Sequence, residues 1–110
     1  MPEYYDPNHL PNFSKIGEGA PDLADKFFAY YGAVFEAGAL SKREKALIAL
    51  AVAHTVQCPY CIDAYTQASL QQGSDLEQMT EAIHVATAIR GGASLIHGLQ
   101  MLDRSQGLSM

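Results

Sequence analysis

The chain contains two cysteines, Cys58 and Cys61, in the segment QCPYCIDAYTQ, and their spacing allows three kinds of chemistry. Two such thiols can form a redox disulfide, supply half of a zinc site, or serve only as two small buried side chains. Pro59, between them, suits the first turn of a helix, where its missing N–H is not needed. A thiol there lies near unpaired backbone N–H groups and the positive end of the helix dipole, which stabilise the reactive thiolate. The position therefore disfavours two inert side chains.

A zinc site would need two ligands besides the cysteines. The candidates are the four histidines of the chain, His9, His54, His84 and His97. None of them belongs to a second C-x-x-C motif or to an H-x₃₋₅-H pair. No metal site is therefore predicted, and a redox pair is the stronger interpretation.

The composition favours a cytoplasmic protein. The net charge is −5, with 7 Lys and Arg against 12 Asp and Glu, so the basic surface that nucleic acids require is not expected. The longest apolar run, residues 46–53, is too short to span a membrane, and the N-terminal residues do not form a secretory signal. In the cytoplasm thiols are kept reduced, so a C-x-x-C pair is typical of a reactive or metal-binding site rather than of a permanent disulfide.

Helices must position the cysteines, because no alternating strand pattern occurs. Residues 1–20 predict an irregular arm that packs by its aromatic side chains. Residues 21–36 show helical spacing of apolar side chains, with Pro21 in the first turn and Gly38 as the stop. Ser41 and Glu44 then form a capping box that opens a second helix.

A third helix is expected to begin at the cysteine motif and to end before Gly73. Ser74 and Glu77 repeat the capping-box pattern and open a fourth helix. Gly91-Gly92 is expected to interrupt this helix or to pack closely, and residues 93–102 continue as a short fifth helix. The prediction is an all-α domain of about five helices over residues 21–104, with a flexible tail over residues 105–110.

One predicted helix carries more apolar surface than a small domain can cover. Residues 46–53 are apolar on every side of the second helix, and such a helix requires burial on all faces. The aromatic helix at 21–36 adds further apolar surface. We therefore expect a homo-oligomer.

A resemblance to a known family is carried by the run ALSKREKALIALAVAHTVQCPYCIDAYTQASLQQG and by the helix with Gly-Gly that follows. Over residues 21–104 the chain resembles the alkylhydroperoxidase D / carboxymuconolactone decarboxylase family. With YYDPNHLP and KFFAYYGAVFEAGAL included, it is most similar to the arsenosugar biosynthesis-associated peroxidase-like subgroup. The resemblance implies an AhpD-like all-helical fold, homo-oligomers that are commonly trimers or hexamers, and thiol-dependent peroxidase or disulfide reductase activity. The family also contains decarboxylases without the cysteine pair, so the pair argues for the peroxidase branch.

The chain departs from the family pattern at the proton relay. The pattern has Glu twelve residues before the first cysteine and His four residues after the second, and this chain has Ala46 and Tyr65 there. Tyr65 could donate a hydrogen bond to a sulfur, but a phenol is a poor base at neutral pH. His54, four residues before Cys58, is the candidate substitute base if the helix continues between them. Glu44 is a weaker candidate because of its capping role.

The function that these residues predict is that of a thiol oxidoreductase whose cysteine pair cycles between dithiol and disulfide. A peroxide-type small molecule would oxidise one thiol to a sulfenic acid, the second thiol would condense with it, and a protein dithiol would reduce the disulfide. The resemblance assigns the attack to Cys61, whereas helix physics favours Cys58; Cys61 is the assignment predicted, with His54 as proton acceptor. No bound cofactor, nucleic acid or membrane partner is expected. The alternative is a non-catalytic helical module that binds a metal or metalloid or acts as a scaffold.

Overall fold

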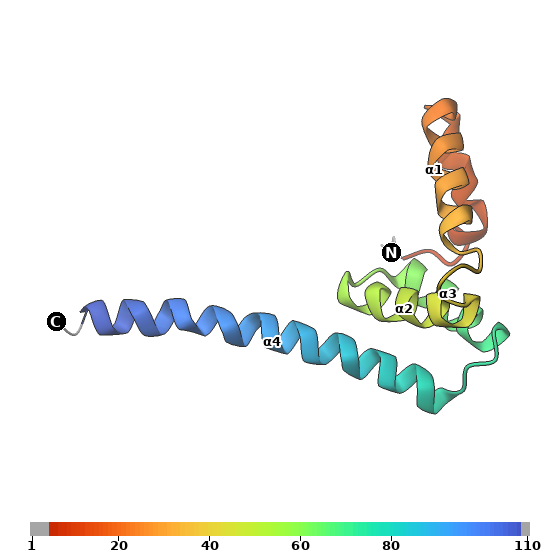
Figure 1. The fold of residues 1–110 in the computed structure, drawn as a ribbon. Helices are drawn as coiled ribbons and strands as arrows, with labels where there is room; N and C mark the ends of the chain where they lie inside the picture. The colour runs from red at the N-terminus through yellow and green to blue at the C-terminus, as the bar shows by residue number, and fades with distance from the viewer. Residues whose placement is uncertain (1–4, 109–110) are drawn as a thin grey trace.

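The computed structural model describes residues 5–108 and confirms the all-α class. No strand occurs among these residues. Figure 1 shows the order of the elements along the chain. They are one 3₁₀ segment and four α-helices: η1 (Leu10–Glu18), α1 (Pro21–Val34), α2 (Lys42–Thr55), α3 (Pro59–Gln71) and α4 (Leu76–Leu108).

Helix α2 is the centre of the packed part of the chain and contacts both α3 and α4. Its buried side chains recur on one face, with Ala46, Leu50 and Ala53 only 3%, 1% and 2% exposed. On the other side of the same helix, Ile48 and Val52 remain half exposed. One copy of the chain therefore covers only one side of the apolar run that the sequence places here.

The predicted capping box at the start of α2 is confirmed. The Glu44 N–H donates to Ser41 Oγ over 3.0 Å, and the Ser41 N–H donates to Glu44 Oε1 over 2.9 Å. These bonds satisfy two backbone donors that have no partner within the helix. The backbone and side-chain hydrogen bonds from Ser41 lower the pKa of the Glu44 carboxyl, so this carboxylate stays an acceptor at neutral pH.

Removal of this cap should destabilise the fold. Ser41→Ala is expected to lower the free energy of unfolding by about 1 kcal/mol, because the Glu44 N–H loses its acceptor. Chemical denaturation followed by circular dichroism, at one fixed protein concentration, measures the change. Ser14→Ala, at an exposed position of η1, is the matched control and should change the stability by less than about 0.5 kcal/mol. Equal losses in the two variants would contradict the capping role.

A sharp break between α2 and α3 places the cysteine motif at a helix start, as predicted. Gln57 has a positive φ of 57°, and Cys58 is extended with φ −103° and ψ 104°. Pro59 is then the first residue of α3. At the other end, Gly73 follows α3 in the left-handed region with φ 88°, which confirms its predicted position beyond the helix end.

The predicted cap of the next helix is wrong by one residue. Asp75, rather than Ser74, forms the reciprocal pair: the Gln78 N–H donates to Asp75 Oδ1 over 2.8 Å, and the Asp75 N–H donates to Gln78 Oε1 over 3.0 Å. Ser74 instead donates its N–H to the Ser69 carbonyl and belongs to the turn that ends α3. The capping patterns of Ser74 with Glu77 and of Asp75 with Gln78 overlap in the sequence. Ser74 is buried in the turn, so the Asp75 pattern is the one that forms the cap.

The predicted interruption at Gly91-Gly92 and the separate fifth helix over 93–102 are also wrong. Helix α4 continues through both glycines to Leu108, and residues 105–108 of the expected tail belong to it. Residues 109 and 110 lie outside the described residues. A Cβ added at either glycine would meet nothing within 4 Å, so neither glycine serves a close contact within the chain. Two glycines cost about 2 kcal/mol of helix stability, which the flanking Ala, Leu and Ile residues tolerate.

The N-terminal segment is more regular than the predicted irregular arm over residues 1–20. Residues 10–18 form η1, with non-helical dihedral angles only at Asn12, and η1 packs against α1. Gly17 allows the close approach of η1 to α1 at this contact, because a Cβ at position 17 would lie 3.0 Å from the Cβ of Ala24. The rings of Phe13 and Phe28 also meet edge to face, with centroids 5.1 Å apart. The expected aromatic packing of the arm is thus confirmed for these residues.

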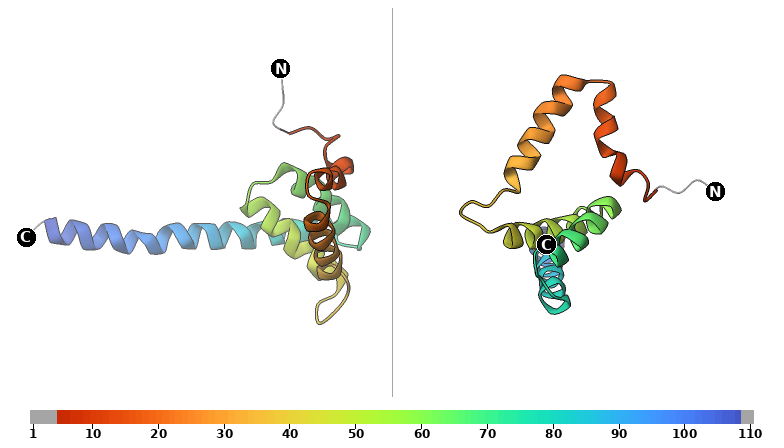
Figure 2. Two further views of the ribbon diagram at one scale, coloured as in Figure 1. Left: turned by 90° about the horizontal axis from the view of Figure 1, so that it is seen from above. Right: turned by 90° about the vertical axis from the view of Figure 1, so that its right-hand side faces the viewer.

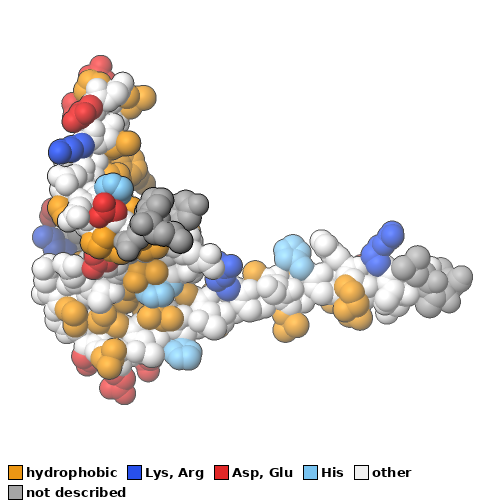
Figure 3. Space-filling view, turned by 180° about the vertical axis from the view of Figure 1, so that it is seen from behind, with side chains coloured by type: hydrophobic (Ala, Val, Ile, Leu, Met, Phe, Trp, Pro, Cys, Tyr) orange, Lys and Arg blue, Asp and Glu red, His pale blue; other side chains and the backbone are white. Residues whose placement is uncertain are grey.

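The single chain is far from compact. Its radius of gyration is 19.0 Å, against about 13 Å for a compact domain of similar length. Figures 1 and 2 show the reason: the C-terminal part of α4 projects away from α2 and α3, and α1 with η1 stands out in another direction. Figure 3 shows apolar side chains along the projecting helix. Within residues 5–108, no helix combines the length and the apolar character that crossing a bilayer requires.

Candidate active site

The two cysteines are free thiols in contact with each other at the start of α3. Their sulfurs are 2.8 Å apart and hydrogen-bonded. Cys58 is the N-cap residue of the helix, and its Sγ accepts the backbone N–H of Cys61 over 3.3 Å. A sulfur in this position accepts a hydrogen bond from an N–H that would otherwise lack a partner, and it lies at the positive end of the helix dipole. The local backbone therefore stabilises negative charge on Cys58.

The thiol of Cys61 has the opposite environment. Burial, followed by the hydrogen bond and the charge of Cys58, raises the pKa of Cys61 to about 11. With its pKa raised in this way, Cys61 keeps its proton at neutral pH. Cys58 Sγ thus lies in contact with the Cys61 sulfur and accepts the Cys61 N–H.

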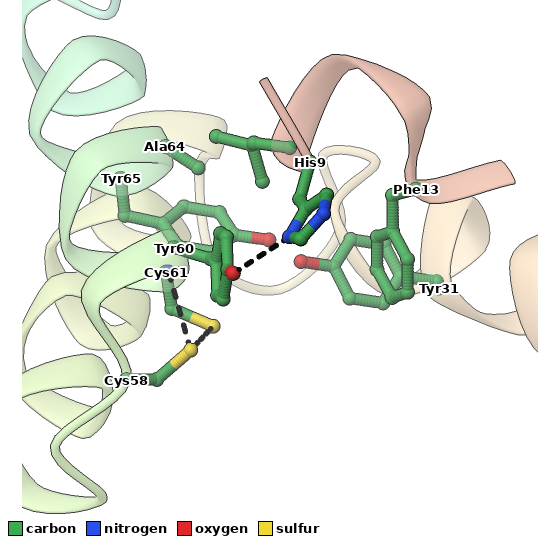
Figure 4. A pocket seen from close by; sticks show the side chains of 9 residues that line it. His9, Phe13, Tyr31, Cys58, Tyr60, Cys61, Ala64 and Tyr65 are labelled. Carbon is green, nitrogen blue, oxygen red and sulfur yellow. Dashed lines mark hydrogen bonds between the residues drawn. The ribbon is translucent and has the colours of Figure 1, made fainter. Parts of the chain in front are cut away.

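Both sulfurs line a cavity of about 350 Å³ between α3 and the pair formed by η1 and α1. Its walls are mostly aromatic, as Figure 4 shows. The lining residues are His9, Leu10, Phe13, Tyr31, Cys58, Tyr60, Cys61, Ala64 and Tyr65. A small organic molecule can therefore reach either sulfur in surroundings that favour apolar groups.

Two tyrosines that line the cavity, Tyr31 and Tyr65, both lie against the ring of Phe35. Tyr65, which replaces the histidine of the family pattern, stacks on Phe35 with ring centroids 5.2 Å apart. The structure thus brings this predicted site residue next to both cysteines. Burial, with the charges of Cys61 and Cys58, raises the pKa of the Tyr31 phenol, so Tyr31 stays a neutral hydrogen-bond donor beside the sulfurs.

The N-terminal arm contributes a histidine to this cavity. His9 Nδ1 lies 3.0 Å from the Tyr60 hydroxyl, and His9 Nε2 lies 3.8 Å from Asp6 Oδ2. The Asp6 N–H donates to the same Tyr60 oxygen over 3.3 Å. Asp6 and Tyr60 thus hold the imidazole from both sides, at the edge of the cavity that contains the sulfurs (Figure 4).

A second contact anchors the arm to the helix of the cysteines. The Tyr5 hydroxyl donates to Asp63 Oδ2 over 2.9 Å, and its ring meets that of Tyr60 edge to face at 4.8 Å. The hydrogen bond to the Asp63 carboxylate is the main cause that raises the pKa of the Tyr5 phenol, so Tyr5 remains a donor at neutral pH. Asp63, one turn into α3, therefore holds the arm in place in addition to its place near the helix dipole.

His54, the predicted proton acceptor, lies elsewhere. Its Nδ1 lies 2.8 Å from the Leu50 carbonyl oxygen, one turn back in α2, and donates to it. The prediction required a helix that continues from His54 to Cys58, but α2 ends at Thr55 and the chain turns at Gln57. Of the residues described, those that line the cavity do not include His54.

Six residues that line the cavity were not identified from the sequence as part of the site: His9, Leu10, Phe13, Tyr31, Tyr60 and Ala64. Tyr60 lies inside the C-x-x-C motif, and its aromatic character was the signal available there. His9 and Tyr31 are distant in sequence from the motif, and only the fold brings them to the cysteines. No group of three or more His, Cys, Asp or Glu side chains suited to a metal ion occurs in the described part of the chain.

Comparison with known proteins gives the family. The sequence model of the carboxymuconolactone decarboxylase family matches residues 21–104, most of the chain. The chain belongs to the carboxymuconolactone decarboxylase family. The chain is also 45% identical over 88 residues to the uncharacterized protein 4 of the cox locus of Paracoccus denitrificans, and the match covers 77% of this chain and 79% of that protein.

Solved structures support the family fold. The chain is similar to a protein from Methanobacterium thermoautotrophicum, with a TM-score of 0.73 and 31% identity over 76% of this chain and 94% of that one. It is also similar to a ligand-free carboxymuconolactone decarboxylase family protein from Legionella pneumophila, with a TM-score of 0.68 and 28% identity over 94% and 97% of the two chains. The family resemblance and the fold are thus confirmed, and the narrower arsenosugar-associated subgroup stays a prediction.

Proposed function

We propose that this member of the carboxymuconolactone decarboxylase family is a thiol oxidoreductase that reduces peroxides with its cysteine pair. The observation that carries the proposal is the contact of two free sulfurs, 2.8 Å apart, at a helix start inside an aromatic cavity. A disulfide bond is about 2.0 Å long, so its formation requires only a small side-chain movement. The aromatic walls suit an organic hydroperoxide.

The proposed reaction has three balanced steps. The Cys58 thiolate attacks the terminal oxygen of the hydroperoxide, the O–O bond breaks, and the leaving alkoxide takes a proton to give an alcohol. The Cys61 thiol then attacks the sulfenic acid of Cys58, which releases water and leaves a disulfide. A protein dithiol finally reduces this disulfide by exchange and is itself oxidised.

The assignment of Cys58 as the attacking residue departs from the assignment of Cys61 that the family resemblance implies. It is supported by the N–H that Cys58 Sγ accepts and by the burial that raises the pKa of Cys61 to about 11. Only a thiolate attacks a peroxide efficiently. The protonated Cys61 is well suited to the second step, because its proton can leave with the hydroxyl of the sulfenic acid as water.

Thiol titration with metal analysis tests the proposal. The reduced protein should contain two reactive thiols per chain, and one equivalent of cumene hydroperoxide should convert both to one disulfide, seen as a loss of two mass units. A dithiol such as dithiothreitol should restore both thiols. Two thiols that persist under excess hydroperoxide, or stoichiometric zinc or arsenic retained through purification, would instead support the non-catalytic binding module.

We also propose that the chain works as a homo-oligomer, in which a second copy covers the apolar surfaces left open by the first. The support is the extended shape of the chain and the exposed apolar side chains of α4, such as Leu95 and Leu99. No residue of α1 is buried within the chain. A helix with this much exposed apolar surface gains stability when that surface is buried, which supports its packing against another copy of the chain.

A further inference from the structure

We propose that His9, carried by the N-terminal arm, is the proton donor of the site and protonates the oxygen that leaves when Cys58 attacks a hydroperoxide. This inference rests on the proposed function and extends it. The position that carries the relay histidine in the family pattern is Tyr65 in this chain, and a phenol transfers protons poorly at neutral pH. The cavity nevertheless contains an imidazole, supplied from a different part of the chain.

The surroundings of His9 hold its imidazole ring at the edge of the cavity. Asp6 Oδ2 lies 3.8 Å from Nε2 on one side of the ring. On the other side, Nδ1 is 3.0 Å from the Tyr60 hydroxyl, which fixes the orientation of the ring. The remaining titratable groups that face the cavity from the packed elements are Tyr31, Cys58, Cys61 and Tyr65.

Imidazole is the side chain that exchanges a proton most readily near neutral pH. The His9 side chain is 69% exposed, so it can recover a proton from water between turnovers. The ring lines the cavity in which the alkoxide leaves, with Nε2 3.8 Å from Asp6 Oδ2. The transfer is balanced: the thiolate forms the S–O bond, the O–O bond breaks, and the His9 proton joins the alkoxide to give the alcohol.

Tyr60 acts as a positioning residue in this proposal. Its hydroxyl contacts the His9 imidazole and accepts the Asp6 N–H, so it connects the arm to the helix that carries the cysteines. The contact of Tyr5 with Asp63 holds the arm from a second point. With Tyr60 truncated to phenylalanine, the imidazole is still present but is no longer held toward the cavity.

The leaving group of the oxidant distinguishes proton donation from a structural role. An alkoxide leaving from tert-butyl hydroperoxide needs a proton, whereas the acetate that leaves from peracetic acid does not. The test compares the rate constants for oxidation of the reduced protein by the two oxidants, as the ratio of the hydroperoxide rate to the peracid rate. A change in folding or in the thiolate fraction of Cys58 lowers both rates equally and leaves the ratio unchanged.

His9→Asn is expected to lower the ratio of the hydroperoxide rate to the peracid rate by about a hundredfold, the usual contribution of a positioned general acid. Tyr60→Phe should lower it by about tenfold, because His9 loses its orientation. His97→Asn, at an exposed position of α4 that does not line the cavity, is the matched control and should leave the ratio unchanged. Circular dichroism should show the same helix content in all three variants.

The possible failures are distinguishable. If both oxidants convert the wild-type dithiol to the disulfide but His9→Asn leaves the ratio unchanged, the proton-donor role of His9 is overturned and the proposed function stands. A ratio that falls equally in His97→Asn would also overturn it. If neither oxidant converts the wild-type dithiol to the disulfide, the proposed function fails, and the role of His9 fails with it.

Discussion

Cys58→Ser is expected to slow oxidation by a hydroperoxide at pH 7 by about a hundredfold or more. Only the Cys61 thiol then remains, and burial is the main cause that raises its pKa to about 11. The burial remains in this variant and keeps the pKa of Cys61 raised, so a smaller fraction of Cys61 is ionised at pH 7 than the few per cent of an ordinary cysteine. The loss of Cys58 removes its hydrogen bond and charge from Cys61 but leaves the burial.

Cys61→Ser should give a different product at nearly the wild-type rate of the first step. The Cys58 thiolate keeps the backbone N–H that it accepts at the start of α3, because that donor belongs to the main chain of residue 61. Oxidation should therefore proceed within about tenfold of wild type but stop at the sulfenic acid, because no second thiol is present to condense with it. Neither serine variant can complete a cycle.

The two variants also differ in their pH dependence. Burial keeps the pKa of Cys61 raised in Cys58→Ser, so the thiolate is lost as the pH falls, and the rate of this variant should still rise above about pH 9, where an ordinary thiol is already mostly ionised. Stopped-flow oxidation with mass spectrometry of trapped sulfenic acid measures both effects. Cys58→Ala and Cys61→Ala are controls for the added serine hydroxyl. A fast Cys58→Ser variant together with an inert Cys61→Ser variant would restore the assignment that the family resemblance implies.

The second large effect concerns assembly through α4. Leu95 and Leu99, one helical turn apart, are 80% and 58% exposed in the single chain. Replacement of both by glutamate is expected to weaken self-association by more than a hundredfold. Burial of each leucine contributes about 1.5–3 kcal/mol, and burial of a carboxylate in its place is unfavourable. Sedimentation velocity at micromolar concentration should show an oligomer for the wild type and single chains for the double variant.

A matched control for this variant lies on the same helix. His97→Glu combined with Gln100→Glu adds the same number of acidic side chains on the opposite side of α4, at 100° per residue from the two leucines. This control should remain oligomeric. A wild-type protein that sediments as a single chain at micromolar concentration would remove the oligomer proposal, and equal dissociation of both double variants would show that net charge, rather than the leucine face, controls assembly.

Several helix starts and ends of this protein could be predicted from residue types and their local order alone. The capping box at Ser41 and Glu44, the proline after Cys58 and the left-handed Gly73 depend on neighbours within four residues, so they could be predicted. The contact between the two sulfurs also depends only on residues that are close in the sequence, because the cysteines are three positions apart. The family could also be identified from the sequence, because its motif is nearly continuous along the chain.

Predictions of helix ends and of the position of His54 failed where two local sequence signals competed or where a helix ended unexpectedly. Ser74 and Asp75 carry equivalent capping patterns, and the turn after α3 selects Asp75 because Ser74 donates its N–H to Ser69. Gly91-Gly92 weakens a helix only by its intrinsic preference, and the good helix formers on both sides outweigh it. The expected position of His54 assumed a continuous helix, which the positive φ of Gln57 ends.

Only the tertiary structure decided what surrounds the sulfurs. His9 and Tyr31 are separated from Cys58 by 49 and 27 positions, and nothing in their local sequence places them beside the cysteines. The fold of η1 and α1 against the start of α3 creates the cavity, and the contacts of Tyr60 with the arm bring an imidazole into it. Helix starts and thiol spacing are short-range properties of the chain. The surroundings that govern proton transfer depend on which distant side chains the fold places within a few ångströms.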